Sequence, residues 1–250
     1  MEEVLSKPLP SAPRPIAFSV LRVPFLLEPD YDETKSYIES NRERLLKKWG
    51  GTHGWERQKK HHNLKGRGLE AGIPHFNLDR LAANSMASHR LIQWIGKTYG
   101  LQASESVYDV LNRYYFVDGH SLNDRPRLAA VVAEALDNVL ASFPSIPSAP
   151  SPPTKEQLLT FLNGNEGRQE IEEALATLHH LGIHGIPKFI IEGQTVVDGA
   201  AQANVFVRVF REIEARGNVQ NSHVFADILG VSEEILQRGS HHAPTESMAA

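Results

Sequence analysis

The hydrophobic pattern changes its period twice along these 250 residues, and this change restricts the folds available. Residues 16–23, IAFSVLRV, are apolar on both alternating faces, as in a strand that is covered on both sides. From about residue 34 to residue 181, apolar residues recur at helical spacing. KFII and QTVV then form β-branched runs separated by Glu192-Gly193, which indicates a hairpin, and an amphipathic helix follows. We therefore predict an α/β domain whose sheet is assembled from both ends of the chain around a helical block.

The predicted organisation has four parts, which differ in proline content and in period. Residues 1–15 contain four prolines and are expected to form a flexible arm. The last part is predicted to contain one more helix, over about 220–237, and a disordered tail. The predicted boundaries are 1–15 for the arm, 16–33 with 182–217 for the sheet-containing core, 34–181 for the helical insertion and 218–250 for the C-terminal helix and tail.

Side chains that can cap helices mark three helix starts within the insertion. Thr34 is predicted to cap a helix through SYIESNRERLLKKWG, and Asn84 or Ser85 to cap MASHRLIQWIGKTYG. Thr154 with Gln157 matches a capping box for the helix that follows. The proline-rich stretch FPSIPSAPSPP, residues 143–153, precedes that helix and is predicted to be a loop or linker.

The charge balance excludes some classes of partner. The chain has 26 basic and 30 acidic residues, a formal charge of −4 and a pI near 6.3. We therefore expect no nucleic-acid partner and no anionic membrane partner, because both require a basic surface. One basic cluster interrupts this composition, and we interpret it as a solvated helix face. Its members are Arg57, Lys59, Lys60, His61 and His62.

Features that the sequence lacks restrict the expected cellular location and chemistry. No apolar run is long enough for a membrane span, and MEEVLSKPLP lacks the features of a signal peptide, so we expect a cytoplasmic protein. The sequence contains no cysteine, so these residues cannot carry out thiol–disulfide exchange. Twelve histidines are present, but the adjacent pairs His61-His62 and His179-His180 diverge by about 100° on a helix. No metal site is predicted.

Gly185-Ile186-Pro187, directly before KFII, is the sharpest local signal. Proline cannot donate to a ladder, so at a strand start it lies at an edge, a bulge or a cis turn. Spacing alone favours an ordinary trans proline that opens the strand. A cis bond would instead turn the main-chain groups of Ile186 outward, where they can pair with an extended peptide or with glutathione.

Four segments resemble one known family in the same order. LGIHGIPKFIIEGQTVVDGAAQANVFVRVF resembles the C-terminal part of the DsbA-like thioredoxin family, FrnE-type subgroup, related to 2-hydroxychromene-2-carboxylate isomerases and kappa-class glutathione transferases. NSMASHRLIQWIGKTYG and LNRYYFVDGHSLND are similar to the family's Ala-His-Arg-Leu segment and to its aromatic-rich helix. VPFLLEPDYD resembles the second strand of the family and its exit. The resemblance covers about residues 16–216.

The resemblance implies an α/β, thioredoxin-like fold with a large all-helical insertion, and it implies site residues. His89 and Arg90 would be catalytic, although packing and a structural ion pair are the simpler roles for them. The resemblance implies no certain cofactor, but it is compatible with glutathione. The implied substrate-binding residues are Asn84, Ser85, Ile186, Pro187, Gly199 and Ala200. For Ser85, helix capping is a better explanation than nucleophilic catalysis, which would need a base in contact.

The chain departs from the family at the catalytic unit. The family has a strand and a helix whose N-terminus carries Cys-x-x-Cys, or a serine in the isomerase and kappa branches, where the helix lowers the thiol pKa. Only 15 residues precede the strand that matches the family's second strand, so the first strand and helix have no counterpart. Three explanations are open. An upstream segment that carries this strand and helix is missing, which we rank first, or residues 16–23 shift to the central position of the sheet, or a partner chain donates a strand to the sheet.

Two classes of function follow. The first is a DsbA/FrnE-like protein that acts without redox cysteines on a small-molecule substrate, as a thiol-independent isomerase or cyclase or with glutathione. The association of FrnE-type proteins with polyketide pathways suggests secondary-metabolite biosynthesis. The alternatives are a non-catalytic binding or partner protein and a truncated thiol–disulfide oxidoreductase. The sequence leaves the substrate and the oligomeric state open, and a homodimer is compatible with it.

Overall fold

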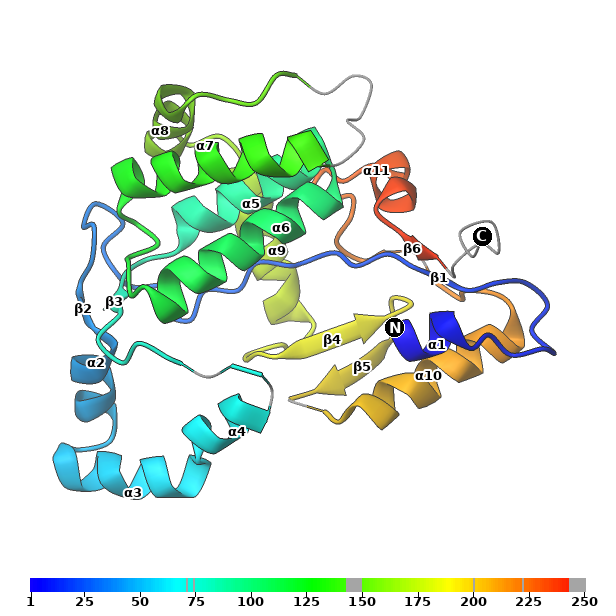
Figure 1. Ribbon diagram of the computed structural model, residues 1–250, viewed down its shortest axis with the longest axis horizontal. Helices are drawn as coiled ribbons and strands as arrows, with labels where there is room; N and C mark the ends of the chain where they lie inside the picture. The colour runs from blue at the N-terminus through cyan, green and yellow to red at the C-terminus, as the bar shows by residue number, and fades with distance from the viewer. Residues whose placement is uncertain (71, 74, 143–149, 200, 222, 243–250) are drawn as a thin grey trace. The chain divides into compact units, whose positions relative to one another are not determined.

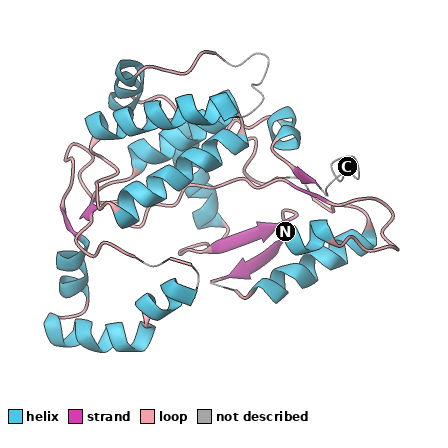
Figure 2. Ribbon diagram, viewed as in Figure 1, coloured by secondary structure: helices cyan, strands magenta, loops and turns pink. Residues whose placement is uncertain are grey.

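The computed structural model describes residues 1–70, 72–73, 75–142, 150–199, 201–221 and 223–242. It divides into two compact units, which are presented separately below (Figure 1). The first unit consists of Met1–Phe25 together with Gln169–Ala250, and the second of Leu26–Arg168. Both contain helices and short strands, and the largest ladder among the described residues is the hairpin of the first unit (Figure 2).

The unit formed by residues 26–168 is mainly helical. A short antiparallel ladder joins β2 (Glu39–Ser40) to β3 (Leu81–Ala82). The helices are α2 (Asn41–Lys48), α3 (Thr52–His62), α4 (Leu64–Glu70), α5 (Met86–Tyr99), α6 (Leu101–Asn112), the π-helix η1 (Arg113–Val117), α7 (Arg125–Ser142) and α8 (Lys155–Asn163).

The core of this unit lies among α5, α6, α7 and α8, which pack against one another (Figure 1). The helical spacing predicted for this segment is confirmed at α5, since Leu91 and Ile95 are fully buried and Trp94 packs against the same cluster. Each buried aliphatic side chain contributes about 1.5–3 kcal/mol, so this cluster dominates the stability of the unit. Other fully buried members are Val107, Leu128, Val132, Leu136 and Leu162.

The helix starts are set by local hydrogen bonds, and one prediction was wrong. Thr154 forms the predicted capping box with Gln157 at the start of α8. Thr34 does not begin a helix, because its amide and hydroxyl both bond the carboxylate of Asp32 in a polar turn. The helix begins instead at α2, where Ser40 and Glu43 form a capping box.

The unit of residues 1–25 and 169–250 is built around a hairpin. Lys188 pairs with Asp198 and Ile191 with Thr195, which confirms the two predicted strands. The ring of Phe189 lies 4.8 Å from that of Phe206, so α10 packs on the hairpin, and α1 contacts α10. The elements are α1 (Glu2–Ser6), β1 (Ala17–Phe18), α9 (Arg168–His180), β4 (Lys188–Ile191), β5 (Thr195–Asp198), α10 (Ala203–Arg216), α11 (Glu233–Arg238) and β6 (His241–His242).

The strand predicted over residues 16–23 is much shorter in the structure. Only Ala17 and Phe18 enter a ladder, and their antiparallel partner is β6. The partner comes from a segment more than 200 residues away that was expected to be a disordered tail, so local pattern could not reveal it. Residues 243–250 of that tail lie outside the described residues, as do 143–149 of the predicted linker. α11 covers only the last part of the helix expected over 220–237.

Candidate functional site

The predicted turn at Pro187 is a cis turn. The Ile186–Pro187 bond is cis, as the resemblance implied. The Pro187 carbonyl accepts a 3.0 Å hydrogen bond from the Gly199 amide, which extends the β4–β5 ladder by one pair. Gly199 has φ +65°, a left-handed conformation that favours glycine. The structure therefore brings Pro187 and Gly199 together, whereas Ala200 lies outside the described residues.

One edge of the hairpin next to this turn has no ladder partner. β4 pairs with β5 on one side, and within the described residues no strand pairs with its other side. Ile186, two residues before the first residue of β4, is 53% exposed, and Phe189 is also exposed. Lys188 forms an ion pair with Asp198 across the hairpin, so this end of the strand carries no net charge. Free main-chain groups beside apolar side chains are features of an edge that can accept another extended segment.

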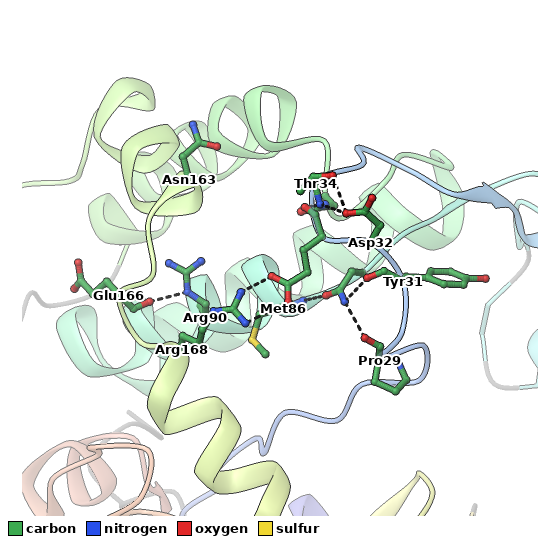
Figure 3. Close-up of polar contacts among 12 residues, drawn as sticks. Pro29, Tyr31, Asp32, Thr34, Met86, Arg90, Asn163, Glu166 and Arg168 are labelled. Carbon is green, nitrogen blue, oxygen red and sulfur yellow. Dashed lines mark hydrogen bonds and ion pairs between the residues drawn. The ribbon is translucent and has the colours of Figure 1, made fainter.

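Asn84, in the other unit, is bound on all sides by main-chain groups. Its side-chain nitrogen donates to the carbonyls of Pro29 at 3.3 Å and Tyr31 at 2.9 Å, and its oxygen accepts from the Met86 amide at 2.8 Å (Figure 3). Asn84 is only 2% exposed. Both amide hydrogens are therefore used, and the side chain fastens the loop at residues 29–31 to the start of α5.

Arg90 is also buried and holds main-chain carbonyls. Its Nε donates to the carbonyl of Glu166 at 2.7 Å (Figure 3), and its Nη2 donates to that of Phe161 at 2.9 Å. Burial lowers the pKa of Arg90, and the nearby cations of Arg168 and Arg125 lower it further. These contacts give Arg90 a positioning role, because it joins α5 to the segment that follows α8.

A second set of side chains, which the sequence analysis missed, binds the same loop. The Asn123 amide donates to the carbonyls of Glu33 at 2.9 Å and Lys35 at 2.7 Å. Arg125 donates to the Glu33 carbonyl, while the Glu33 carboxylate forms an ion pair with Arg168. With Asn84, these donors bind alternate carbonyls along the loop. No sequence signal reveals such contacts, because every residue carries a carbonyl.

Ser85 and His89 differ from their neighbours in being partly exposed. Ser85 occupies the N-cap position of α5, and its hydroxyl makes no capping hydrogen bond. Its carbonyl accepts from the amide of His89 at 3.0 Å and from the hydroxyl of Ser88. Asn84 provides the cap through its contact with Met86 instead. Of the two ionisable residues predicted at this helix, His89 is therefore partly exposed, whereas Arg90 is buried.

No three histidine, aspartate or glutamate side chains of the described residues are grouped so as to hold a metal ion. None of the helices in the described part of the chain combines the length and apolar character needed to cross a membrane.

Comparison with known proteins identifies the fold. No family model matches the sequence, and no curated protein matches it. The crystal structure of a probable DsbA oxidoreductase from Streptomyces coelicolor superimposes with a TM-score of 0.60 at 21% identity. The match covers 80% of this chain and 76% of that one. The chain therefore has the thioredoxin-like fold with extensive helical structure that is found in DsbA-like proteins.

Proposed function

We propose that this protein is a DsbA-fold binding protein that holds an extended main chain along β4 without thiol chemistry. The observation that carries the proposal is the edge of β4 beside exposed Ile186, with which no strand of the described part of the chain pairs. Such an edge binds a peptide by strand addition, in which main-chain hydrogen bonds supply affinity and alternate side chains supply specificity. The apolar character of Ile186 and Phe189 favours a ligand with apolar side chains.

The chemistry of the chain supports binding over redox catalysis. Thiol–disulfide exchange proceeds through a thiolate, and these 250 residues include no cysteine. Asn84 and Arg90 are occupied with main-chain groups, so they position backbone segments and are poorly suited to reacting with a substrate. An enzyme of the kind implied by the resemblance would have to rely on other residues.

The ligand is an extended main chain that comes either from an unfolded polypeptide or from glutathione. Fluorescence anisotropy with labelled, carboxymethylated α-lactalbumin tests the first source, and a thermal shift with millimolar glutathione tests the second. Ile186→Asp should weaken binding by about tenfold, a loss of about 1.4 kcal/mol. The matched control is Leu181→Asp, because Leu181 is an apolar residue of the same unit with 51% exposure, against 53% for Ile186.

The outcomes separate the hypotheses. Binding of neither probe, or equal losses from the two aspartate variants, would refute the β4 site.

Two copies that pair through the same edge of β4 would form a homodimer. Size-exclusion chromatography detects such a dimer, and Ile186→Asp should dissociate it.

A second function rests on the partial exposure of His89 on α5. In this hypothesis His89 transfers a proton in the isomerisation or cyclisation of a small aromatic substrate, with Arg90 positioning the helix. A role in secondary-metabolite biosynthesis follows from the same family resemblance. The test is turnover of 2-hydroxychromene-2-carboxylate, with and without glutathione. His89→Ala should abolish turnover with an unchanged circular dichroism spectrum, and an unchanged rate would exclude His89.

A further inference from the structure

Three arginine side chains meet beside the loop of residues 33–35. Arg125 Nη2 donates to the carbonyl of Glu33 at 2.9 Å, and both terminal nitrogens of Arg168 bond the carboxylate of the same residue. Burial lowers the pKa of Arg90, and the nearby charges of Arg168 and Arg125 lower it further. Figure 3 shows Arg90 and Arg168 close to each other. All three arginines belong to the unit of residues 26–168, and we call them the arginine cluster.

The arginine cluster contains more positive than negative charge. Glu33 pairs with Arg168, whereas neither Arg90 nor Arg125 contacts a carboxylate among the described residues. Arg90 bonds two main-chain carbonyls, and Arg125 bonds one carbonyl and two asparagine side chains. The carboxylate of Glu166 also acts on Arg90, but Glu166 is exposed, so water and salt screen its charge. Within the described structure, two positive charges are therefore bonded to neutral groups alone.

Arg90 is the buried member of the cluster, and one of its nitrogens reaches solvent. The residue is 2% exposed, and the ring of Phe161 covers one face of its guanidinium at 5.1 Å. Its Nη1 makes no hydrogen bond to any described residue. The fully buried side-chain nitrogen that lacks a partner in the described part of the chain is Nε of Arg80, so Nη1 of Arg90 is open to solvent. Arg125 and Arg168 are partly exposed, so a small ligand can reach the cluster. Because a buried cation is costly unless it is paired, this side of Arg90 is suited to an anion.

We infer that the arginine cluster binds the phosphate group of a small molecule, as free phosphate or as a phosphate monoester. A phosphate monoester carries a charge of about −1.5 to −2 near pH 7, which matches the two positive charges of Arg90 and Arg125. Guanidinium groups donate parallel hydrogen bonds to phosphate oxygens, so these two side chains supply suitable donors. A carboxylate, or a phosphodiester of nucleic acid, carries one charge and would leave the other uncompensated. The cluster lies outside the unit that contains β4, so the inference does not depend on peptide binding there.

The first probe is inorganic phosphate, titrated into the full chain by isothermal titration calorimetry. The pH is about 7.5, where phosphate is mostly the dianion, and sodium chloride keeps the ionic strength constant. Glycerol 3-phosphate is the probe for a monoester, and acetate is the comparison with a single charge. We expect one of the two phosphates to saturate the protein and to bind at least about tenfold more tightly than acetate, and the tighter phosphate identifies the source. Saturable binding of neither phosphate, or equal binding of acetate, would overturn the inference.

Variants with opposite expected effects test the location. Arg125→Gln removes one of the two charges and should weaken phosphate binding by about tenfold or more, because charge-assisted hydrogen bonds are lost. Arg127→Gln is the matched control, since it makes the same change two positions along α7, at an arginine that pairs with Asp124. It should change the Kd by less than about twofold, because exposed ion pairs contribute little. Glu33→Gln should tighten binding by about threefold or more, since it removes a negative charge that contacts the cluster.

Circular dichroism establishes which variants are folded. If Arg125→Gln does not fold, Glu33→Gln still tests the cluster, because damage to the fold would weaken binding, whereas the inference requires that binding tighten. Equal weakening by Arg125→Gln and Arg127→Gln, or binding that Glu33→Gln leaves unchanged or weakens, would refute the arginine cluster as the phosphate site. None of these results bears on β4, which lies in the other unit and is probed with different ligands.

Discussion

Asn84→Ala distinguishes a structural role of this residue from the ligand-binding role that the family resemblance implies. The substitution leaves the carbonyls of Pro29 and Tyr31 and the amide of Met86 without their side-chain partner. Each unsatisfied buried group costs about 1–3 kcal/mol. Water can reach part of the loop, so we expect a total loss of about 2–4 kcal/mol in the free energy of unfolding, a large fraction of the stability of a domain.

Urea denaturation followed by tryptophan fluorescence measures this loss in the structural unit of residues 26–168, which contains Asn84. Trp49, Trp55 and Trp94 are the three tryptophans, and all lie within residues 26–168. The midpoint should fall while the slope with denaturant stays constant. Asn138→Ala is the control, because Asn138 is exposed and should change stability by less than about 0.5 kcal/mol.

A change below about 1 kcal/mol for Asn84→Ala, together with a loss of ligand binding, would refute the structural role. That result would mean that Asn84 is free to contact a ligand and that the loop at residues 29–31 is held by other bonds.

Three further predictions concern the same unit. Arg90→Met keeps much of the side-chain volume but releases the carbonyls of Phe161 and Glu166, so the unfolding free energy should fall by about 2–4 kcal/mol, and an unchanged urea midpoint would contradict the contacts. Hydrogen bonds donated by Lys47, and to a smaller extent by Tyr31, hold the pKa of the Glu39 carboxyl below its usual 4.5. The contribution of this carboxylate to the free energy of unfolding is therefore present above pH 4.5 and is lost as the pH falls further. Glu39→Gln should flatten the loss of stability below pH 4.5, whereas an unaltered acid profile would exclude this linkage. Ser40→Ala should cost about 1 kcal/mol, because it removes the cap of α2, and thermal melting that matches the native protein would argue against the capping box.

Part of the site could be predicted from local pattern. The sequence placed Pro187 directly before a strand, and the family resemblance implied the cis bond found there. Asn84 and Arg90 were selected as residues of interest at α5, but their partners are main-chain carbonyls far along the chain. Such partners have no residue-type signature, so the sequence could not distinguish a positioning role from a catalytic one.

The sequence by itself determined the helices of residues 86–142, the hairpin of β4 and β5 and the capping box at Thr154. Periodicity, β-branching and capping act over a few residues, so they can be read directly. Only the tertiary structure decided that β1 pairs with β6 and that the loop before β2 is held by Asn84 and Asn123. These features depend on contacts between segments that are distant in the sequence, and the local residue pattern does not reveal such contacts.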